Sequence, residues 1–385
     1  MNLSETELNF QCSEELGMLT DAATSYLREN STIADARRLA ETDSGYSPEQ
    51  WQTLAEMGWL GLATPEEFGG SGLGYVELTK ISELMGRYLF SSPFLATTLA
   101  SQALIASHDE DKKMQWLPEL SSGSSIATLA LMEQNNSWEL GDITCTADSS
   151  GDGYRLDGIK QFVLDGQNAD LMLVTALLKG RPALFLLTPD LVKKLVQRPE
   201  QLTHHARRSS RFRFGGLQLP KSALLAEGDE ARRILGHVHS LAWLLLAADH
   251  AGTANGAIEL TAEYLRVRKQ FGKYIGTYQA LSHPLVNAAM LTEDTLSLAY
   301  HGAALFDGTL GGQSEISARM AKVRGGEASN LAGSRAIQSH GGMGFTWECH
   351  AHLYFKRGQW NEYSFGDGGH QKRHLADLII GDLPH

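Results

Sequence analysis

The feature that most constrains this chain is a stretch of short apolar runs, residues 124–226, between two stretches with a long helical pattern. Within it, runs such as 171–175 and 183–187 are separated by turn residues and by no long helical segment. Short runs at this spacing are typical of a compact antiparallel β domain. On either side, apolar residues recur at three- and four-residue spacing, as on one face of an amphipathic helix. The order helical, β, helical predicts domains at 1–123, 124–226 and 227–385.

The helical patterns can be placed more closely. The expected N-terminal helices lie at 21–29, 48–57, 75–89 and 109–120. The expected C-terminal helices lie at 229–269, broken or bent near Gly252 and Gly256, and at 281–306, 314–342 and 370–380. Long helices with apolar faces are typical of a bundle. The predicted fold class is therefore α+β, with an N-terminal helical domain, a middle antiparallel β domain and a C-terminal four-helix bundle.

Composition places the chain among ordinary globular proteins. With 42% hydrophobic and 20% charged residues, it has enough apolar side chains to bury a core. Its net charge of −12, with Lys and Arg scattered, argues against a nucleic-acid binder, which needs a basic face. An anionic substrate stays compatible with this charge, because a few local cations can bind phosphates on an acidic protein.

The remaining bulk features predict a cytoplasmic protein. Cys12, Cys145 and Cys349 form no closely spaced pair, so neither a disulfide framework nor a zinc site is expected. The N-terminus is acidic and has no apolar core, so no signal peptide is expected. The strongest apolar run, 241–248, is too short to span a bilayer, so no membrane contact is expected either.

Two short motifs carry candidate chemistry. Arg268-Lys-Gln-Phe-Gly272 lies at a corner between expected helices, where a bidentate Arg would suit a phosphate or pyrophosphate. The alternative is a helix end stopped by Gly and stabilised by basic side chains. Gln338-Ser-His-Gly341-Gly342 follows about 70 residues later. Its glycines would let a ligand approach the backbone, or they would form a plain helix–helix turn.

In this order and spacing, the motifs resemble the acyl-CoA dehydrogenase family. Further stretches carry the resemblance, which covers nearly the whole chain: Leu54-Ala-Glu-Met-Gly-Trp-Leu-Gly-Leu-Ala-Thr-Pro-Glu-Glu-Phe-Gly-Gly70 and Phe345-Thr-Trp-Glu. The run His352-Leu-Tyr-Phe-Lys-Arg357 is similar to the bacterial branch associated with bulky substrates such as steroid-CoA. The resemblance implies an FAD enzyme that oxidises acyl-CoA thioesters to 2-enoyl-CoA and forms a tetramer built from two dimers.

The resemblance also implies which residues hold FAD. The Arg corner and the Gly-Gly turn of such proteins reach across a subunit interface to the pyrophosphate and adenosine half of the neighbour's FAD. The matching positions in this chain keep the pattern: Arg268, Gln270, Phe271, Gln338, Gly341 and Gly342.

The catalytic base that the resemblance implies is missing. Counting from Gln338, the position of the usual Glu holds Phe365. An alternative position on the long helix before Arg268 holds Ala242, followed by Trp243. Asp249 lies on the same helical face about two turns away and is a weaker candidate. The carboxylates that flank Phe365 are expected to be solvated charges: Glu362 and Asp367.

The flavin cradle is altered as well. Where the family has Thr-Glu-Pro-Gly-x-Gly-Ser-Asp, this chain has Met132-Glu-Gln-Asn-Asn-Ser-Trp-Glu139, in which only Glu133 matches. Where the family has Trp-Ile-Thr-Asn-Gly, it has Phe162-Val-Leu164-Asp165-Gly166, so a hydroxyl near the flavin becomes Leu164. Each lost hydrogen bond would cost on the order of 1 kcal/mol net. The replacements affect the chain's own site and spare the residues that serve a neighbour.

Three hypotheses remain open. The first is a subunit without a base that completes the FAD site of a homologous, base-bearing subunit in a heterotetramer. The second is a homo-oligomeric FAD dehydrogenase with a displaced base, Asp249 or Asp367. The third is a non-redox acyl-CoA-binding scaffold. For the two dehydrogenase hypotheses, the resemblance implies an electron-transferring flavoprotein as electron acceptor. His370 and His374 lack a His-Glu-x-x-His pattern, so no metal is predicted.

Overall fold

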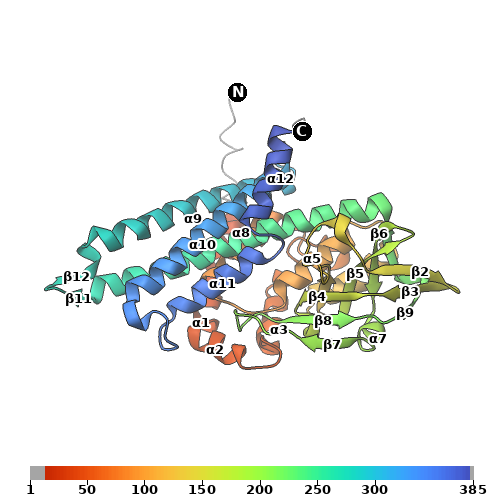
Figure 1. Cartoon of the computed structure of the whole chain (residues 1–385), viewed down its shortest axis with the longest axis horizontal. Helices are drawn as coiled ribbons and strands as arrows, with labels where there is room; N and C mark the ends of the chain where they lie inside the picture. The colour runs from red at the N-terminus through yellow and green to blue at the C-terminus, as the bar shows by residue number, and fades with distance from the viewer. Residues whose placement is uncertain (1–13, 382–385) are drawn as a thin grey trace. The chain divides into compact units, whose positions relative to one another are not determined.

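The computed structural model describes residues 14–381, so Cys12 and the N-terminal segment discussed above lie outside the described residues. The order helical, β, helical is confirmed (Figure 1). Contacts divide the chain into two compact units. The first comprises Met1–Arg37, Gly74–Phe90 and Ser240–His385, and the second Arg38–Leu73 and Ser91–His239. The boundaries at 123/124 and 226/227 follow changes of secondary-structure type, and as domain boundaries they stay a prediction.

The N-terminal part is helical for recognisable local reasons. Ser47 accepts the backbone N–H of Gln50 and Pro48 occupies the first turn, so a helix begins there. Asp109 caps another helix by accepting from Lys112. The helix at 94–105 was not predicted, because nearly all its residues are buried and no amphipathic pattern arises. The helices are α1 (Glu14–Asn30), α2 (Ile33–Ala40), α3 (Pro48–Glu56), α4 (Tyr75–Arg87), α5 (Phe94–Ile105) and α6 (Glu110–Ser121).

The second unit holds two β-sheets. The larger has the order β10-β6-β5-β2-β3-β9, with β1 also paired to β5, and the smaller has the order β4-β8-β7. The prediction of an antiparallel domain was wrong for two ladders, because β5 runs parallel to both β1 and β2. Parallel pairing depends on how distant strands meet, which apolar runs do not encode.

The strands of these sheets are β1 (Ala127–Ala130), β2 (Thr146–Ser150), β3 (Gly153–Asp157), β4 (Ile159–Leu164), β5 (Leu171–Leu178), β6 (Arg181–Leu187), β7 (Val196–Pro199), β8 (Ser209–Arg213), β9 (Leu217–Pro220) and β10 (Leu224–Glu227). A short helix, α7 (Pro189–Val192), follows β6. The core of this unit is built from inward-facing side chains such as Val174, Phe185 and Phe212. Burial of these apolar groups supplies most of its stabilisation.

The C-terminal part is helical, with α8 (Gly228–Val267), α9 (Gln279–Phe306), α10 (Ser314–His340), α11 (Ala351–Tyr363) and α12 (Gly368–Ile380). Figure 1 shows α9, α10 and α11 lying along α8. The helix expected to be broken or bent near Gly252 and Gly256 is not broken there, since α8 is continuous through both glycines. These glycines instead allow α4 to approach, because a Cβ on Gly252 would lie 1.7 Å from the Glu83 oxygen. Helix α11 was missed in a segment interpreted mainly through its motifs.

Candidate functional site

One position expected to carry a catalytic carboxylate, Phe365, contacts Trp243, the neighbour of the other expected position, Ala242, in the first unit. Trp243, in α8, donates from Nε1 to the backbone oxygen of Phe365 at 2.8 Å. Phe365 lies between α11 and α12, and both side chains are buried. Gln371 Nε2 donates to the same oxygen at 2.9 Å. These donors hold a turn in which Phe365 has a left-handed φ of 58°, a conformation that costs a non-glycine residue roughly 1–2 kcal/mol.

A buried arginine completes this arrangement. The Arg319 guanidinium carbon lies 3.7 Å from the centroid of a Trp243 ring, a cation–π contact. Its Nη1 donates to Gln371 Oε1 at 2.6 Å, and its Nη2 lies 2.9 Å from Glu315 Oε1. Trp243, Phe365, Gln371 and Arg319 thus form a closed ring of contacts. None of these four side chains can act as a general base, so this place holds an aromatic pair and a cation where a carboxylate was expected.

Asp249, the alternative base, belongs to a buried ion pair. Arg357 donates to its Oδ1 from Nε at 2.8 Å and to its Oδ2 from Nη2 at 2.5 Å. Asn361 Nδ2 and Thr253 Oγ1 also donate to Oδ1, at 2.6 and 3.2 Å. Arg357 is fully buried and Asp249 nearly so. Asp249 would have to weaken its pairing with a buried guanidinium before it accepted a substrate proton, so this geometry favours a structural role.

The two carboxylates that flank Phe365 also have structural contacts. Asp367 caps α12 by accepting the backbone N–H of His370 at 2.8 Å. Glu362 Oε1 accepts the N–H of Gly368 at 2.8 Å. The expectation that Glu362 is a solvated charge was wrong for its other oxygen: Oε2 is buried and has no hydrogen-bond partner among the described residues. Gly326 makes room for it, because a Cβ there would lie 2.0 Å from Oε2.

In the second unit, polar side chains at the expected flavin cradle hydrogen-bond to one another. Gln161 Nε2 donates to Asn136 Oδ1 at 2.5 Å, and Arg211 Nη2 donates to Gln161 Oε1 at 2.9 Å. Sequence reasoning missed this network, because its members come from a loop, β4 and β8. With these groups paired internally and Leu164 in place of a hydroxyl, the residues present do not fit the flavin ring half of FAD.

Glu133, the one cradle residue that matches the family pattern, lies in the core. Lys160 Nζ lies 2.6 Å from Glu133 Oε1, and both side chains are almost completely buried. Lys160 also donates to Thr175 Oγ1 at 2.7 Å. Glu133 in turn accepts the backbone N–H of Cys145 at 3.1 Å. This residue therefore ties strands together, and its match carries no evidence for flavin binding.

Asp165 follows β4 in the same unit, and its carboxyl has an unusually high pKa. Burial raises the pKa of its carboxyl from 3.8 to about 7, although Arg207 and Arg208 oppose the shift. Its Oδ2 is buried without a hydrogen-bond partner among the described residues. Its φ of 51° is left-handed, a conformation that Asn adopts as readily as Asp. The folded protein therefore holds a proton here that the unfolded chain releases at lower pH.

Asp165→Asn should make stability less dependent on pH. Because the folded pKa is raised, the stabilisation from protonated Asp165 is complete below pH 3.8 and is lost as pH rises through about 7. The variant should be more stable than the wild type at pH 8, by on the order of 2–4 kcal/mol, with the difference shrinking towards pH 4. Urea unfolding across this range measures it. Asp157→Asn, at an exposed position, is the matched control; equal profiles for both variants would refute the assignment.

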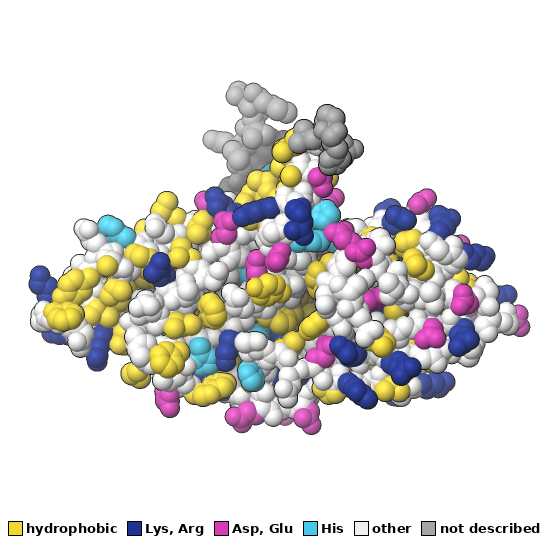
Figure 2. All heavy atoms as spheres, viewed as in Figure 1, with side chains coloured by type: hydrophobic (Ala, Val, Ile, Leu, Met, Phe, Trp, Pro, Cys, Tyr) yellow, Lys and Arg dark blue, Asp and Glu magenta, His cyan; other side chains and the backbone are white. Residues whose placement is uncertain are grey.

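The residues expected to serve a neighbouring subunit are exposed. Beyond α8, β11 (Lys269–Gln270) pairs with β12 (Lys273–Tyr274) in a two-residue hairpin. Its tip, Phe271-Gly272, has φ values of 51° and 75°, as in a type I′ turn. Phe271 is 91% exposed, which is unusual for a large apolar side chain. Its left-handed backbone conformation is also uncommon for a bulky residue. Figure 2 shows basic and hydrophobic side chains gathered over this hairpin, at the left end of the view.

The glycine turn after α10 is equally open. Gln338, Gly341 and Gly342 are exposed, and Gly341 has a φ of 64°. A Cβ on either glycine would meet no atom within 4 Å, so the backbone is accessible to a ligand. The six expected FAD-binding residues therefore all present themselves to solvent, and they fit the phosphate and adenosine half of a nucleotide: Arg268, Gln270, Phe271, Gln338, Gly341 and Gly342.

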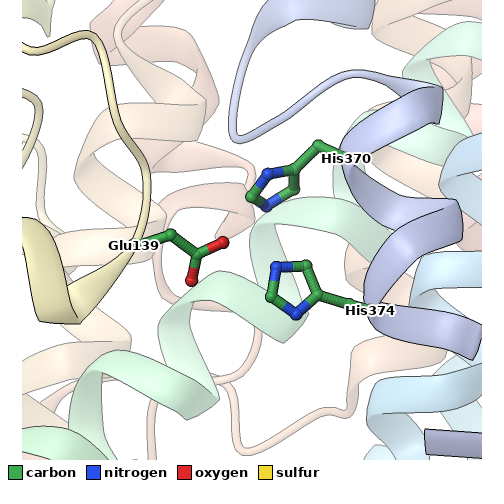
Figure 3. Close-up of side chains that lie close together, drawn as sticks. All are labelled: Glu139, His370 and His374. Carbon is green, nitrogen blue, oxygen red and sulfur yellow. The ribbon is translucent and has the colours of Figure 1, made fainter. Parts of the chain in front are cut away.

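The histidine pair on α12 does not make a metal site by itself. Figure 3 shows His370 and His374 projecting from neighbouring turns of α12, and their ring centroids are 4.7 Å apart. Glu139, the third side chain that Figure 3 labels, belongs to the other unit. Two ligands within one unit are fewer than zinc sites use, and we assign no metal to this pair.

Among the residues described, none of the helices combines the length and apolarity needed to cross a membrane.

Comparison with known proteins gives two matches to family models. The model described as acyl-CoA dehydrogenase, N-terminal domain, matches residues 13–124. The model described as acyl-CoA dehydrogenase, C-terminal domain, matches residues 242–380. Together they cover more than half of the chain. The second match contains both exposed motifs and both positions at which the base was expected.

Individual relatives are similar over almost their whole length. Acyl-CoA dehydrogenase IpdE2 of Mycobacterium tuberculosis is 29% identical, with 89% of this chain and 91% of the relative covered. IpdE2 of Mycolicibacterium smegmatis is 26% identical, with 96% and 100% covered. A solved structure of a variant of the Tcur3481-Tcur3483 steroid ACAD has a TM-score of 0.85 and 29% identity, and the match covers 95% of this chain and 98% of the solved chain.

Proposed function

Because this chain belongs to the acyl-CoA dehydrogenase family, we propose that it is the base-lacking subunit of a heteromeric, FAD-dependent acyl-CoA dehydrogenase. In this proposal a homologous subunit supplies the catalytic carboxylate and the flavin cradle. The present chain supplies Arg268, Gln338 and the Gly341-Gly342 turn to that subunit's FAD. The assembled enzyme introduces a double bond between the α and β carbons of an acyl-CoA.

The observation that carries the proposal is the contact between Trp243 and Phe365. Desaturation requires a base within hydrogen-bond reach of the α-proton. Of the two positions expected for that base, one holds Phe365, and the other holds Ala242, whose neighbour Trp243 contacts Phe365. The nearby carboxylates of Asp249 and Asp367 already serve an ion pair and a helix cap. An active site formed by this chain's own residues would therefore lack a proton acceptor.

The two units differ in whether their residues fit FAD. FAD, when bound, accepts a hydride from the β carbon of the substrate. The exposed Arg268 guanidinium and the open glycine turn fit its pyrophosphate and adenosine half, since a planar guanidinium binds phosphate oxygens in pairs. The internally paired Gln161 and Asn136 do not fit its ring. This division supports a chain that completes another subunit's cofactor site.

The substrate class and the partners are proposed by analogy with the relatives. The solved relative is described as a steroid ACAD, and its description joins two protein names. By analogy, we propose a bulky, steroid-like acyl-CoA as the substrate and a heterotetramer with the base-bearing subunit. An electron-transferring flavoprotein is the proposed acceptor, and the cytoplasm the proposed location.

The first test is the visible absorption of the chain purified alone. We expect no stoichiometric flavin, because its own cradle lacks the hydrogen-bonding groups for the ring. Co-expression with a base-bearing subunit should yield a complex with one FAD per pair of chains. One FAD bound per chain in the isolated protein, with acyl-CoA dehydrogenase turnover, would overturn the proposal in favour of a homo-oligomer with a displaced base.

A further inference from the structure

An aromatic stack joins the two exposed motifs. The rings of Tyr264 and His340 have centroids 4.2 Å apart and an interplanar angle of 24°. Tyr264 lies one helical turn before Arg268 in α8, and His340 is the last residue of α10, next to Gly341. Two residues 76 positions apart in sequence are thus held together immediately behind both candidate nucleotide-binding segments. The stack belongs entirely to the first unit.

Each of the two residues is hydrogen-bonded within its own motif, His340 through its ring and Tyr264 through its backbone. The His340 Nδ1 lies 2.7 Å from the Ala336 backbone oxygen, to which the protonated nitrogen can donate, and this contact orients the imidazole at the end of α10. Tyr264 is bound to the other motif through the backbone, because its backbone carbonyl oxygen accepts the N–H of Arg268 at 3.0 Å. Arg268 in turn accepts the N–H of Ile275 at 2.9 Å, which places the hairpin. The stack is therefore a direct side-chain contact between the segment that carries Arg268 and the segment that carries Gly341.

We propose that Tyr264 and His340 are positioning residues that set the separation between Arg268 and the Gly341-Gly342 turn. The inference rests on the proposed function, since the ligand that needs this separation is the pyrophosphate and adenosine half of a partner's FAD. A ligand held at two points binds tightly when both points are already at the right distance. Stacked aromatic pairs contribute enough to change such a binding equilibrium about 3- to 10-fold.

The test uses the complex of this chain with its base-bearing subunit. Tyr264→Ala and His340→Ala should each weaken FAD binding about 3- to 10-fold, measured by flavin release on dilution. Tyr264→Phe and His340→Phe keep a stacking ring and should restore binding. The double alanine variant should be no weaker than the single variants, because one shared contact is lost. His283→Ala, at an exposed position of α9, is the matched control.

A second readout needs no flavin and no turnover. ADP, as a probe of the half-site, should give saturation-transfer NMR signals with this chain alone, weaker in His340→Ala and restored in His340→Phe. If His340→Phe fails to restore binding in both assays, the positioning role is overturned and the imidazole is assigned to direct contact with the ligand. If Arg268→Ala weakens FAD binding while both alanine variants behave as wild type, this inference alone fails. If Arg268→Ala also has no effect, the proposed function itself fails.

Discussion

Asp249→Asn should destabilise the whole protein rather than remove a catalytic step. The substitution leaves the fully buried Arg357 guanidinium without its counter-charge, and breaking a buried ion pair in this way costs roughly 3–5 kcal/mol. Asn can still accept a hydrogen bond, but it does not neutralise the arginine. Urea unfolding followed by circular dichroism should therefore show a large fall in the free energy of unfolding, with lower yields of folded protein.

Asp367→Asn is the matched control for this change. Asp367 is the other candidate for a displaced base, and it caps α12, a position that Asn fills about equally well. We expect its stability to change by less than about 0.5 kcal/mol and the activity of the assembled enzyme to be kept. A stable Asp249→Asn protein that has lost turnover would contradict the structural assignment and support a base at Asp249.

Arg268→Ala should strip flavin from the assembled enzyme while leaving this chain folded. Arg268 is exposed, so its removal leaves no buried group unpaired. A charge-assisted hydrogen bond to a phosphate contributes about 1.5–3 kcal/mol, which corresponds to an approximately 10- to 100-fold loss of FAD affinity. The measurement is the ratio of flavin absorbance to protein in the purified complex, followed by titration with added FAD.

Arg266→Ala tests whether charge alone explains such a loss. Arg266 lies two residues earlier in the last turn of α8, is exposed and has the same charge. The two variants change the net charge of the chain equally. Flavin content should stay at the wild-type value in Arg266→Ala. An equal loss in both variants would indicate general electrostatics instead of a specific contact, and no loss in Arg268→Ala would contradict the proposed half-site.

Sequence patterns predicted the local structure well where periodicity was strong. The caps at Ser47 and Asp109 begin helices at predicted places, and β5 and β6 lie where apolar runs indicated strands. Patterns did not predict α5, which is buried on all sides, since a fully buried helix has no polar face. They also failed for the parallel pairing of β5, which depends on strand order.

The sequence by itself determined which chemical groups this protein has at its motifs. It placed Phe365 where a carboxylate was expected, and it kept Arg268 and the Gly341-Gly342 turn. Residue identity and spacing along the chain are enough for such conclusions. They also sufficed for the order of helical and β segments, because helix and strand periodicities are local properties.

Only the tertiary structure decided what those groups do for one another. Trp243 and Phe365 are 122 residues apart, yet they share a hydrogen bond, and Arg319 closes the ring around them. Asp249 could be judged as a base only once Arg357, from another helix, was seen to pair with it. The stack of Tyr264 on His340 is equally invisible in the sequence. Such contacts form when packing brings distant helices together, and no local pattern records which side chains will then meet.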